Sequence, residues 1–99
     1  MKDDRHDSHA PLFNPGRIVA TPGAMDALND SPMQAAMLLG RHMGGDWGDI
    51  CEEDSRANTA ALRYGNRLVS VYATQSGARL WIITESDRST TTLLLPDEY

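Results

Sequence analysis

The spacing of hydrophobic residues changes from a helical pattern to a strand pattern at about residue 66. Before that point, two Ser/Thr-Pro pairs each place a capping residue ahead of a proline suited to the first helical position. Gln34 completes a capping box in the second of them. The pattern therefore predicts a short helix over about 22–29 and a longer one over about 32–43.

The longer helix carries an apolar stripe that we expect to face the core, because its members recur at helical spacing. The stripe consists of Met33, Ala36, Met37 and Gly40, widened by Leu38 and Leu39. A third helix is predicted from Asp49 as N-cap to Gly65. Its first turns hold Glu52, Glu53 and Asp54, where the helix dipole favours negative charge.

Three segments after residue 66 read as strands, because they are rich in Val, Ile, Tyr, Trp and Thr. They are "RLVSVYAT", "ARLWIIT" and "TTTLLLP" (67–74, 78–84 and 90–96), with a short hairpin loop between the first two. Alternation puts Val69 and Val71 on the opposite face from Leu68 and Tyr72. We therefore expect an α+β fold, with two or three N-terminal helices packed on a three-stranded antiparallel β-meander. The run "RIVA" is expected either to add an edge strand or to lead into the first helix.

Composition sets limits on function. The chain has 99 residues, which fits a single domain over 17–99 after a disordered lead-in at 1–16. A net charge of −5, with eight arginines and one lysine, disfavours broad nucleic-acid binding. Cys51 is the only cysteine, which excludes an internal disulfide and favours a reducing cytoplasm. No apolar run predicts a membrane span, and no motif predicts a metal site or cofactor.

The first candidate site is the corner "RHMGGDWGDICEED" at 41–54. Trp47 lies among glycines, so it is expected in a loop, either anchoring that loop to the core or displayed beside Asp46 and Asp49 as a docking epitope. His42 is expected in the last helical turn. It either bonds to free carbonyl groups there or acts as a general acid or base.

The second candidate site is "TESDRSTTT" at 84–92, a turn carrying Glu85, Asp87 and Arg88. Asp87 followed two residues later by a serine suits an Asx turn, and the threonines suit a half-exposed strand. Alternatively, His42, Arg88 and one of Thr90 or Thr92 would form a phosphodiester-cleaving set, in which histidine moves protons and arginine offsets phosphorane charge.

Three segments, "GRIVATPGA", "RHMGGDWGD" and "LWIITESDRSTTTLLLPDEY", resemble a small bacterial family found largely on plasmids and integrated elements. Its members are often labelled plasmid-related or restriction-associated, and the resemblance covers nearly all of residues 16–99. It implies a mobile-element context rather than a particular activity. A restriction methyltransferase is excluded, because the chain lacks a βαβ nucleotide-binding unit and a glycine-rich cofactor loop.

Two functions follow from this context, and the sequence favours binding over catalysis. One is a non-catalytic inhibitor or adaptor of anti-CRISPR or anti-restriction type, binding a protein or nucleoprotein complex with a basic surface. Its expected binding residues are Asp46, Trp47, Asp49, Glu52, Glu53, Glu85 and Asp87. The alternative is a metal-independent, toxin-like ribonuclease using His42, Arg88 and Thr90. The predicted order of helices and strands resembles barnase/colicin-type nucleases, but the resemblance is one of architecture only. The partner's identity and the oligomeric state stay open.

Overall fold

Capping residues set the starts of the first two helices. In the computed structural model, which describes residues 10–99, the side chains of Thr21 and Ser31 accept hydrogen bonds from the backbone N–H groups of Ala24 and Gln34. These caps begin α2 (Pro22–Ala27) and α3 (Pro32–Met43), as the Ser/Thr-Pro pairs predict.

The start of α4 (Glu52–Tyr64) differs from the prediction. Its N-cap is Cys51 rather than Asp49, and no side chain caps it. Asp49 is held elsewhere, because its backbone N–H donates to the Val71 carbonyl and its carboxylate contacts Arg79. The acidic residues still occupy the first turn of α4, and Gly65 ends the helix with a φ of 77°, in the left-handed region.

The sheet has four strands instead of three. The elements are β1 (Arg17–Ala20), β2 (Leu68–Ala73), β3 (Arg79–Thr84) and β4 (Thr90–Leu94), followed by the short 3-10 helix η1 (Pro96–Glu98). β2, β3 and β4 form the expected antiparallel meander, and β1 adds to β4 in parallel to give the order β1-β4-β3-β2. The α+β class is confirmed. The parallel pairing of β1 makes the sheet mixed. β1 forms hydrogen bonds with the backbone groups along the edge of β4 that would otherwise be unpaired.

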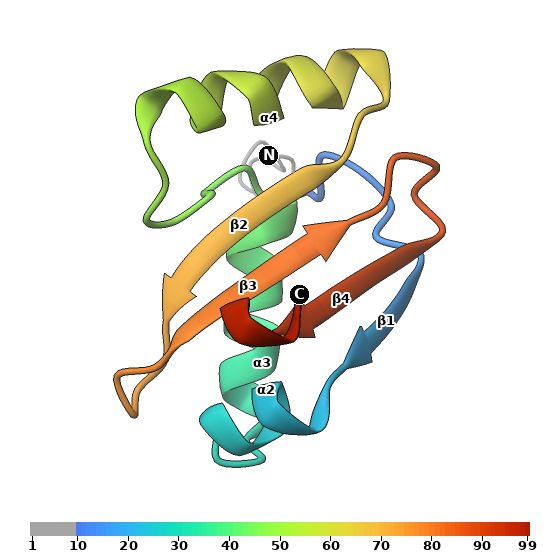
Figure 1. The fold of residues 1–99 in the computed structure, drawn as a ribbon. Helices are drawn as coiled ribbons and strands as arrows, with labels where there is room; N and C mark the ends of the chain where they lie inside the picture. The colour runs from blue at the N-terminus through green and yellow to red at the C-terminus, as the bar shows by residue number, and fades with distance from the viewer. Residues whose placement is uncertain (1–9) are drawn as a thin grey trace, which may run out of the picture.

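The main core lies between α2, α3 and one face of the sheet, while η1 lies on the opposite face and α4 lies beside β2 (Figure 1). Its buried residues are Ala24, Leu28, Leu38, Tyr72, Leu80, Ile82 and Leu93. A second cluster, formed by Trp47, Ala61 and Leu68, joins α4 and the corner to the end of β2. In the part of the chain that is described, no helix is long and apolar enough to cross a membrane.

The centre of the predicted core stripe of α3 is wrong, whereas Leu38, which is expected to widen it, is buried and Leu39 packs against the core. Met33 is 82% exposed and Met37 is 55% exposed, and the buried positions are Gln34, Leu38 and His42. Gln34 is buried because its amide is satisfied, donating to the Leu28 carbonyl and accepting from the backbone N–H of Gln75. Buried polar residues with partners are stable in a core, and a pattern based on hydropathy assigns them to the surface.

Residues 10–16 run along the domain N-terminal to β1. The Leu12 N–H donates to the Met43 carbonyl, Phe13 packs against the second cluster, and the Pro15 carbonyl accepts from Thr91. These contacts extend the domain N-terminally of the expected start at residue 17. The remainder of the expected lead-in, residues 1–9, lies outside the described residues.

Candidate functional site

The corner between α3 and α4 pairs with the outer edge of β2. The Val71 N–H donates to the Trp47 carbonyl at 3.0 Å, and the Asp49 N–H donates to the Val71 carbonyl at 2.7 Å. Gly48, between them, has a φ of 79°, and a Cβ at this position would collide with the Val71 carbonyl oxygen. Glycine is therefore required here, and the corner protects the edge of β2 from pairing with another strand.

Trp47 is a core residue. It is 6% exposed and packs with Ala61 and Leu68. Beside it, the Tyr72 hydroxyl donates to the Asp46 carbonyl at 2.6 Å, so the loop is tied to the sheet on both sides. Of its two expected roles, the geometry places Trp47 in the core-anchoring one, and its indole is not displayed to solvent.

Four of the expected binding acids form ion pairs with arginines at the surface. The pairs are Arg41–Asp46 (2.7 Å), Arg79–Asp49 (3.2 Å), Arg56–Glu52 (2.8 Å) and Arg67–Glu85 (3.5 Å). The hydrogen bond from Arg41 lowers the pKa of the Asp46 carboxyl. Exposed pairs of this kind contribute about 0–1 kcal/mol each, so an approaching partner displaces them at little cost.

Glu53 and Asp87, the other two expected binding acids, differ in their surroundings, as does Asp54 beside Glu53. Glu53 and Asp54 form no ion pair with any residue in the described range 10–99, and both are exposed on α4. Asp87 accepts a hydrogen bond from the Ser89 N–H at 2.9 Å, in the Asx turn that its spacing predicts. Hydrogen bonds from Ser89 lower the pKa of the Asp87 carboxyl, so this acid has a local structural role.

His42 lies in a buried chain of hydroxyl groups. Its exposed fraction is 0%, and its Nδ1 and Nε2 lie 2.6 Å from the Ser70 hydroxyl and 2.9 Å from the Thr84 hydroxyl. The Thr84 hydroxyl lies 2.7 Å from that of Thr91, which donates to the Pro15 carbonyl at 2.7 Å. The chain links α3 to β2, β3, β4 and the N-terminal segment, so His42 bonds to strand hydroxyls rather than to the free carbonyls of its own helix.

The protonation of His42 follows from this burial. Desolvation, followed by the nearby positive charge of Arg88, lowers the pKa of His42 to about 4. The imidazole is therefore neutral at pH 7, with one ring nitrogen donating and the other accepting. Phe13 and Trp47 lie edge-on to the ring, with centroids at 5.4 and 5.8 Å. Both ring nitrogens are occupied and the ring has no contact with solvent, so a substrate cannot reach it in this conformation.

Arg88 holds backbone carbonyl groups at the end of α4. Its guanidinium donates to the carbonyls of Asn66 (2.7 Å), Ala61 (3.0 Å) and Glu85 (3.1 Å). It thereby joins the C-terminus of α4 to the turn between β3 and β4, and its own backbone adopts a φ of 61° in that turn.

Thr90 lies on the opposite face of the sheet from His42. The neighbouring residue in β4, Thr91, points toward His42, and side chains alternate along a strand. The structure therefore does not bring His42, Arg88 and Thr90 together at one solvent-facing position.

We expect Arg88→Lys to lower the free energy of unfolding by about 1–2 kcal/mol, because one ammonium cannot span the carbonyls that the guanidinium fork bridges. Urea unfolding followed by circular dichroism measures the change. The matched control is Arg63→Lys, at an exposed position of α4, for which we expect a change below about 0.5 kcal/mol. Equal effects of the two substitutions would contradict the capping role of Arg88.

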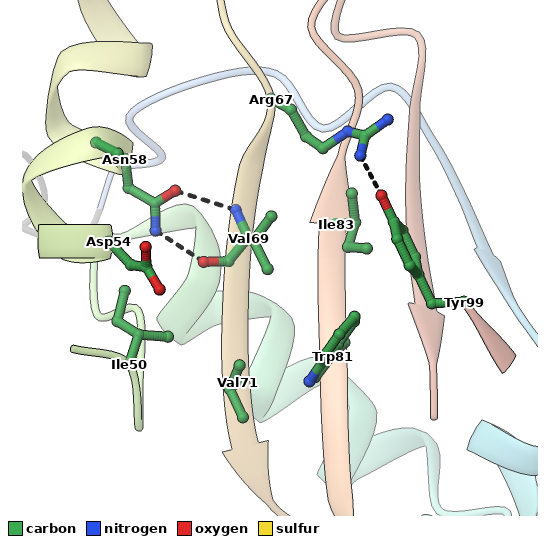
Figure 2. Close-up of a pocket in the computed structure, with 10 residues that line it drawn as sticks. Ile50, Asp54, Asn58, Arg67, Val69, Val71, Trp81, Ile83 and Tyr99 are labelled. Carbon is green, nitrogen blue, oxygen red and sulfur yellow. Dashed lines mark hydrogen bonds between the residues drawn. The ribbon is translucent and has the colours of Figure 1, made fainter. Parts of the chain in front are cut away.

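The face of the sheet opposite α3 carries an apolar groove (Figure 2). Its volume is about 390 Å³. The floor is formed by side chains of β2 and β3, and one wall by the corner and α4; these residues are Val69, Val71, Trp81, Ile83, Ile50, Asp54, Ala57 and Asn58. The Asn58 amide is fully used, because it donates to the Val69 carbonyl at 2.7 Å and accepts from the Val69 N–H at 3.1 Å.

The C-terminal residue forms the other wall of the groove. The Tyr99 ring lies edge-on to Trp81, with centroids 5.4 Å apart, and its hydroxyl accepts a hydrogen bond from Arg67. Arg67 also contacts Glu85, so it holds the C-terminus against the sheet (Figure 2). Tyr99 itself remains exposed.

The groove cannot be located from the sequence alone, although part of its signal is present there. Alternation correctly separates Val69 and Val71 from the helix-facing residues of β2, and the strand containing Trp81 is apolar on both faces. A second apolar face indicates a second covering layer or a binding surface. Only the tertiary arrangement shows that α4 and Tyr99 border this face and leave a groove between them.

Within residues 10–99, no group of three or more His, Cys, Asp or Glu side chains is arranged to hold a metal ion. Comparisons with protein-family models, curated proteins and solved structures each found no match for this chain.

Proposed function

We propose that this protein is a small acidic accessory protein of a mobile genetic element that acts in the cytoplasm by binding a host nucleic-acid-handling complex. It acts without catalysis, by occupying or modulating a basic surface of that complex, as an anti-CRISPR or anti-restriction protein would. The observation that carries the proposal is a set of exposed carboxylates next to an open apolar groove. Apolar anchors surrounded by polar groups are typical of protein interfaces.

The charge arrangement supports binding to a basic surface. Asp49, Glu52 and Glu53 lie close together in sequence at the start of α4, and their side chains are exposed. The arginine partners of Asp49 and Glu52 are also exposed, so a partner's arginines can replace them with little loss of stability. Complementary charge of this kind raises the association rate and makes it sensitive to salt.

The surroundings of His42 and Arg88 also favour binding over cleavage. His42 is buried and neutral, and Arg88 is engaged by carbonyl groups of the fold. A ribonuclease needs these groups at a phosphate, in contact with substrate. The described geometry supplies a structural role for each of them, and nothing in it favours the ribonuclease alternative.

A pull-down from host lysate with matched charge variants tests the proposal. The test variant replaces Asp49, Glu52 and Glu53 by their amides, and the control replaces Asp26, Asp30 and Asp97, which are exposed on other parts of the fold. Each variant loses three negative charges. We expect the test variant alone to lose affinity for a stoichiometric nucleic-acid-handling partner, by roughly 3- to 150-fold if each contact contributes 0.2–1 kcal/mol.

Two outcomes would contradict the proposal. One is that no nucleic-acid-handling complex is captured by the unaltered protein. The other is that both variants lose the partner equally, which would assign the effect to net charge rather than to this surface. RNA cleavage by the purified protein, abolished by His42→Gln in a folded variant, would instead establish the ribonuclease alternative.

A further inference from the structure

We infer that the apolar groove is an anchor site for a partner protein segment in which an aliphatic side chain is followed or preceded by an arginine or lysine. The aliphatic side chain lies over Val71 and Trp81, and the cation pairs with Asp54. The inference rests on the proposed function in that it names the chemistry of the partner, and it adds a second contact region to the acidic corner.

The size and lining of the groove suit a side chain of this kind. At about 390 Å³ it falls within the range of roughly 300–1,000 Å³ that is typical of ligand sites. Val69, Val71 and Ile83 line its floor around Trp81. Trp81 is half-buried, so an aliphatic group placed there removes apolar surface from water on both partners.

The polar groups at the groove distinguish one kind of partner from others. The Trp81 indole N–H has no hydrogen-bond partner among residues 10–99, and Figure 2 shows its nitrogen on the side of Val71. A backbone carbonyl of an extended segment would accept this hydrogen bond. The Asn58 amide is not available to bind a partner, because its N–H and its oxygen both form hydrogen bonds with the Val69 backbone.

The carboxylate of Asp54 favours a partner segment that carries a positive charge. Among the acids of the corner, Asp46, Asp49 and Glu52 have arginine partners, whereas Asp54 has none within the described residues and lines the groove. Figure 2 shows it above Ile50, on the wall contributed by α4. The arginine that lines the groove, Arg67, lies at the Tyr99 wall and is already engaged by Tyr99 and Glu85. An unpaired carboxylate next to an apolar floor favours a cation beside an apolar side chain.

The test is a titration of the full chain with short capped peptides, followed by NMR with assigned backbone and indole resonances. The probe is an acetylated and amidated hexapeptide of the order glycine, arginine, leucine, leucine, arginine, glycine. Control peptides replace both leucines by serine or both arginines by glutamine. We expect saturable shifts of the Trp81 indole and of the Val71 and Ile83 amides. The Trp47 indole, buried in the second cluster, should stay unchanged as an internal reference.

A matched pair of protein variants separates the groove from general electrostatic attraction. Asp54→Asn and Glu53→Gln remove the same charge at adjacent exposed positions of α4, and of the two residues only Asp54 lines the groove. We expect Asp54→Asn to raise the Kd of the arginine–leucine peptide by about 1.5- to 5-fold, and Glu53→Gln to change it less. Because both positions are exposed, both variants should keep the unaltered spectrum elsewhere.

Four results would overturn the inference: no saturable binding at millimolar peptide, shifts that map away from the groove, equal effects of the two variants, or equal binding of the serine peptide. A fifth contradicting result would come from the free protein. If it sediments as a dimer and its Trp81 is protected from solvent, the occupant of the groove is a second copy of the chain. The lysate experiment above fails or succeeds separately. Peptide binding without a captured complex would support the groove and contradict the proposed function.

Discussion

Leu38→Ala should lower the free energy of unfolding by about 2–5 kcal/mol, whereas Met37→Ala, one residue earlier in α3, should change it by less than about 0.5 kcal/mol. Leu38 is 3% exposed and belongs to the main core cluster, so its truncation removes buried contacts and leaves a cavity. Met37 is 55% exposed, so its truncation mainly exchanges one exposed side chain for another. Leucine and methionine have similar helix propensities, which makes the pair well matched.

Urea unfolding measured by circular dichroism and by tryptophan fluorescence gives both values, provided that the slope with denaturant is unchanged. The larger loss at Leu38 identifies the face of α3 that lies against the sheet. A larger loss at Met37 would contradict this orientation and would return the stripe of Met33, Ala36, Met37 and Gly40 to the core.

This orientation marks the limit of what hydrophobic spacing predicts in the chain. Spacing locates α3 correctly and its caps define where it begins, because both signals are local. It selects the wrong face, because Gln34 and His42 are buried through hydrogen bonds to residues far away in sequence. The hydroxyl groups of Ser70 and Thr84 form hydrogen bonds with His42, and nothing in the sequence indicates that these two residues face a helix.

The sheet shows the same distinction between local and distant signals. The strands of the meander and the two faces of β2 follow from alternation, which is a property of each strand alone. The run Arg17–Ala20 is compatible with a strand or with a lead into α2, and only its pairing with the distant β4 decides between them. The N-cap of α4 shifts from Asp49 to Cys51 for a related reason, since β2 and Arg79 hold Asp49 outside the helix.

The candidate site divides in a similar way. Glu52, Glu53 and Asp54 are on the surface, as their position in the first turn of a helix suggests, and the Asx turn at Asp87 follows from its own spacing. The groove is different, because it exists only where α4 and the C-terminal Tyr99 border one open face of the sheet. No short stretch contains that information.

Acidification from pH 6.5 to about pH 4 should destabilise the protein through His42. Burial, and then the charge of Arg88, lower the pKa of His42 from 6.5 to about 4 in the folded state. The unfolded chain keeps a pKa near 6.5 at this position, so between these values the unfolded state binds more protons and stability falls with falling pH. The lowered pKa of His42 corresponds to on the order of 3 kcal/mol in the free energy of unfolding. This contribution is present above about pH 6.5 and is mostly lost when the pH has fallen to about 4.

Carboxylates contribute in a different range. Hydrogen bonds from Arg41, Ser89 and Thr21 lower the pKa values of Asp46, Asp87 and Glu98 respectively, below their ordinary values of 3.8, 3.8 and 4.5. Their contributions are present above those ordinary values and are lost only as the pH falls through the lowered ones. Loss of stability that begins near pH 6 is therefore assigned to a histidine, and loss that begins below pH 4.5 to the acids.

His42→Gln provides the control, because glutamine keeps a donor and an acceptor for Ser70 and Thr84 but does not titrate in this range. Its stability at pH 7 is expected to be lower, since the amide fills the site less well, but its slope between pH 6.5 and 4.5 should be nearly flat. Where the variant is too unstable to compare, the assigned His42 ring proton of the unaltered protein should show no titration above about pH 5. A His42 resonance that titrates near pH 6.5 would mean that the folded protein accepts the proton at no cost. In that case burial does not keep the ring neutral, and a proton-transfer role for His42 is no longer disfavoured.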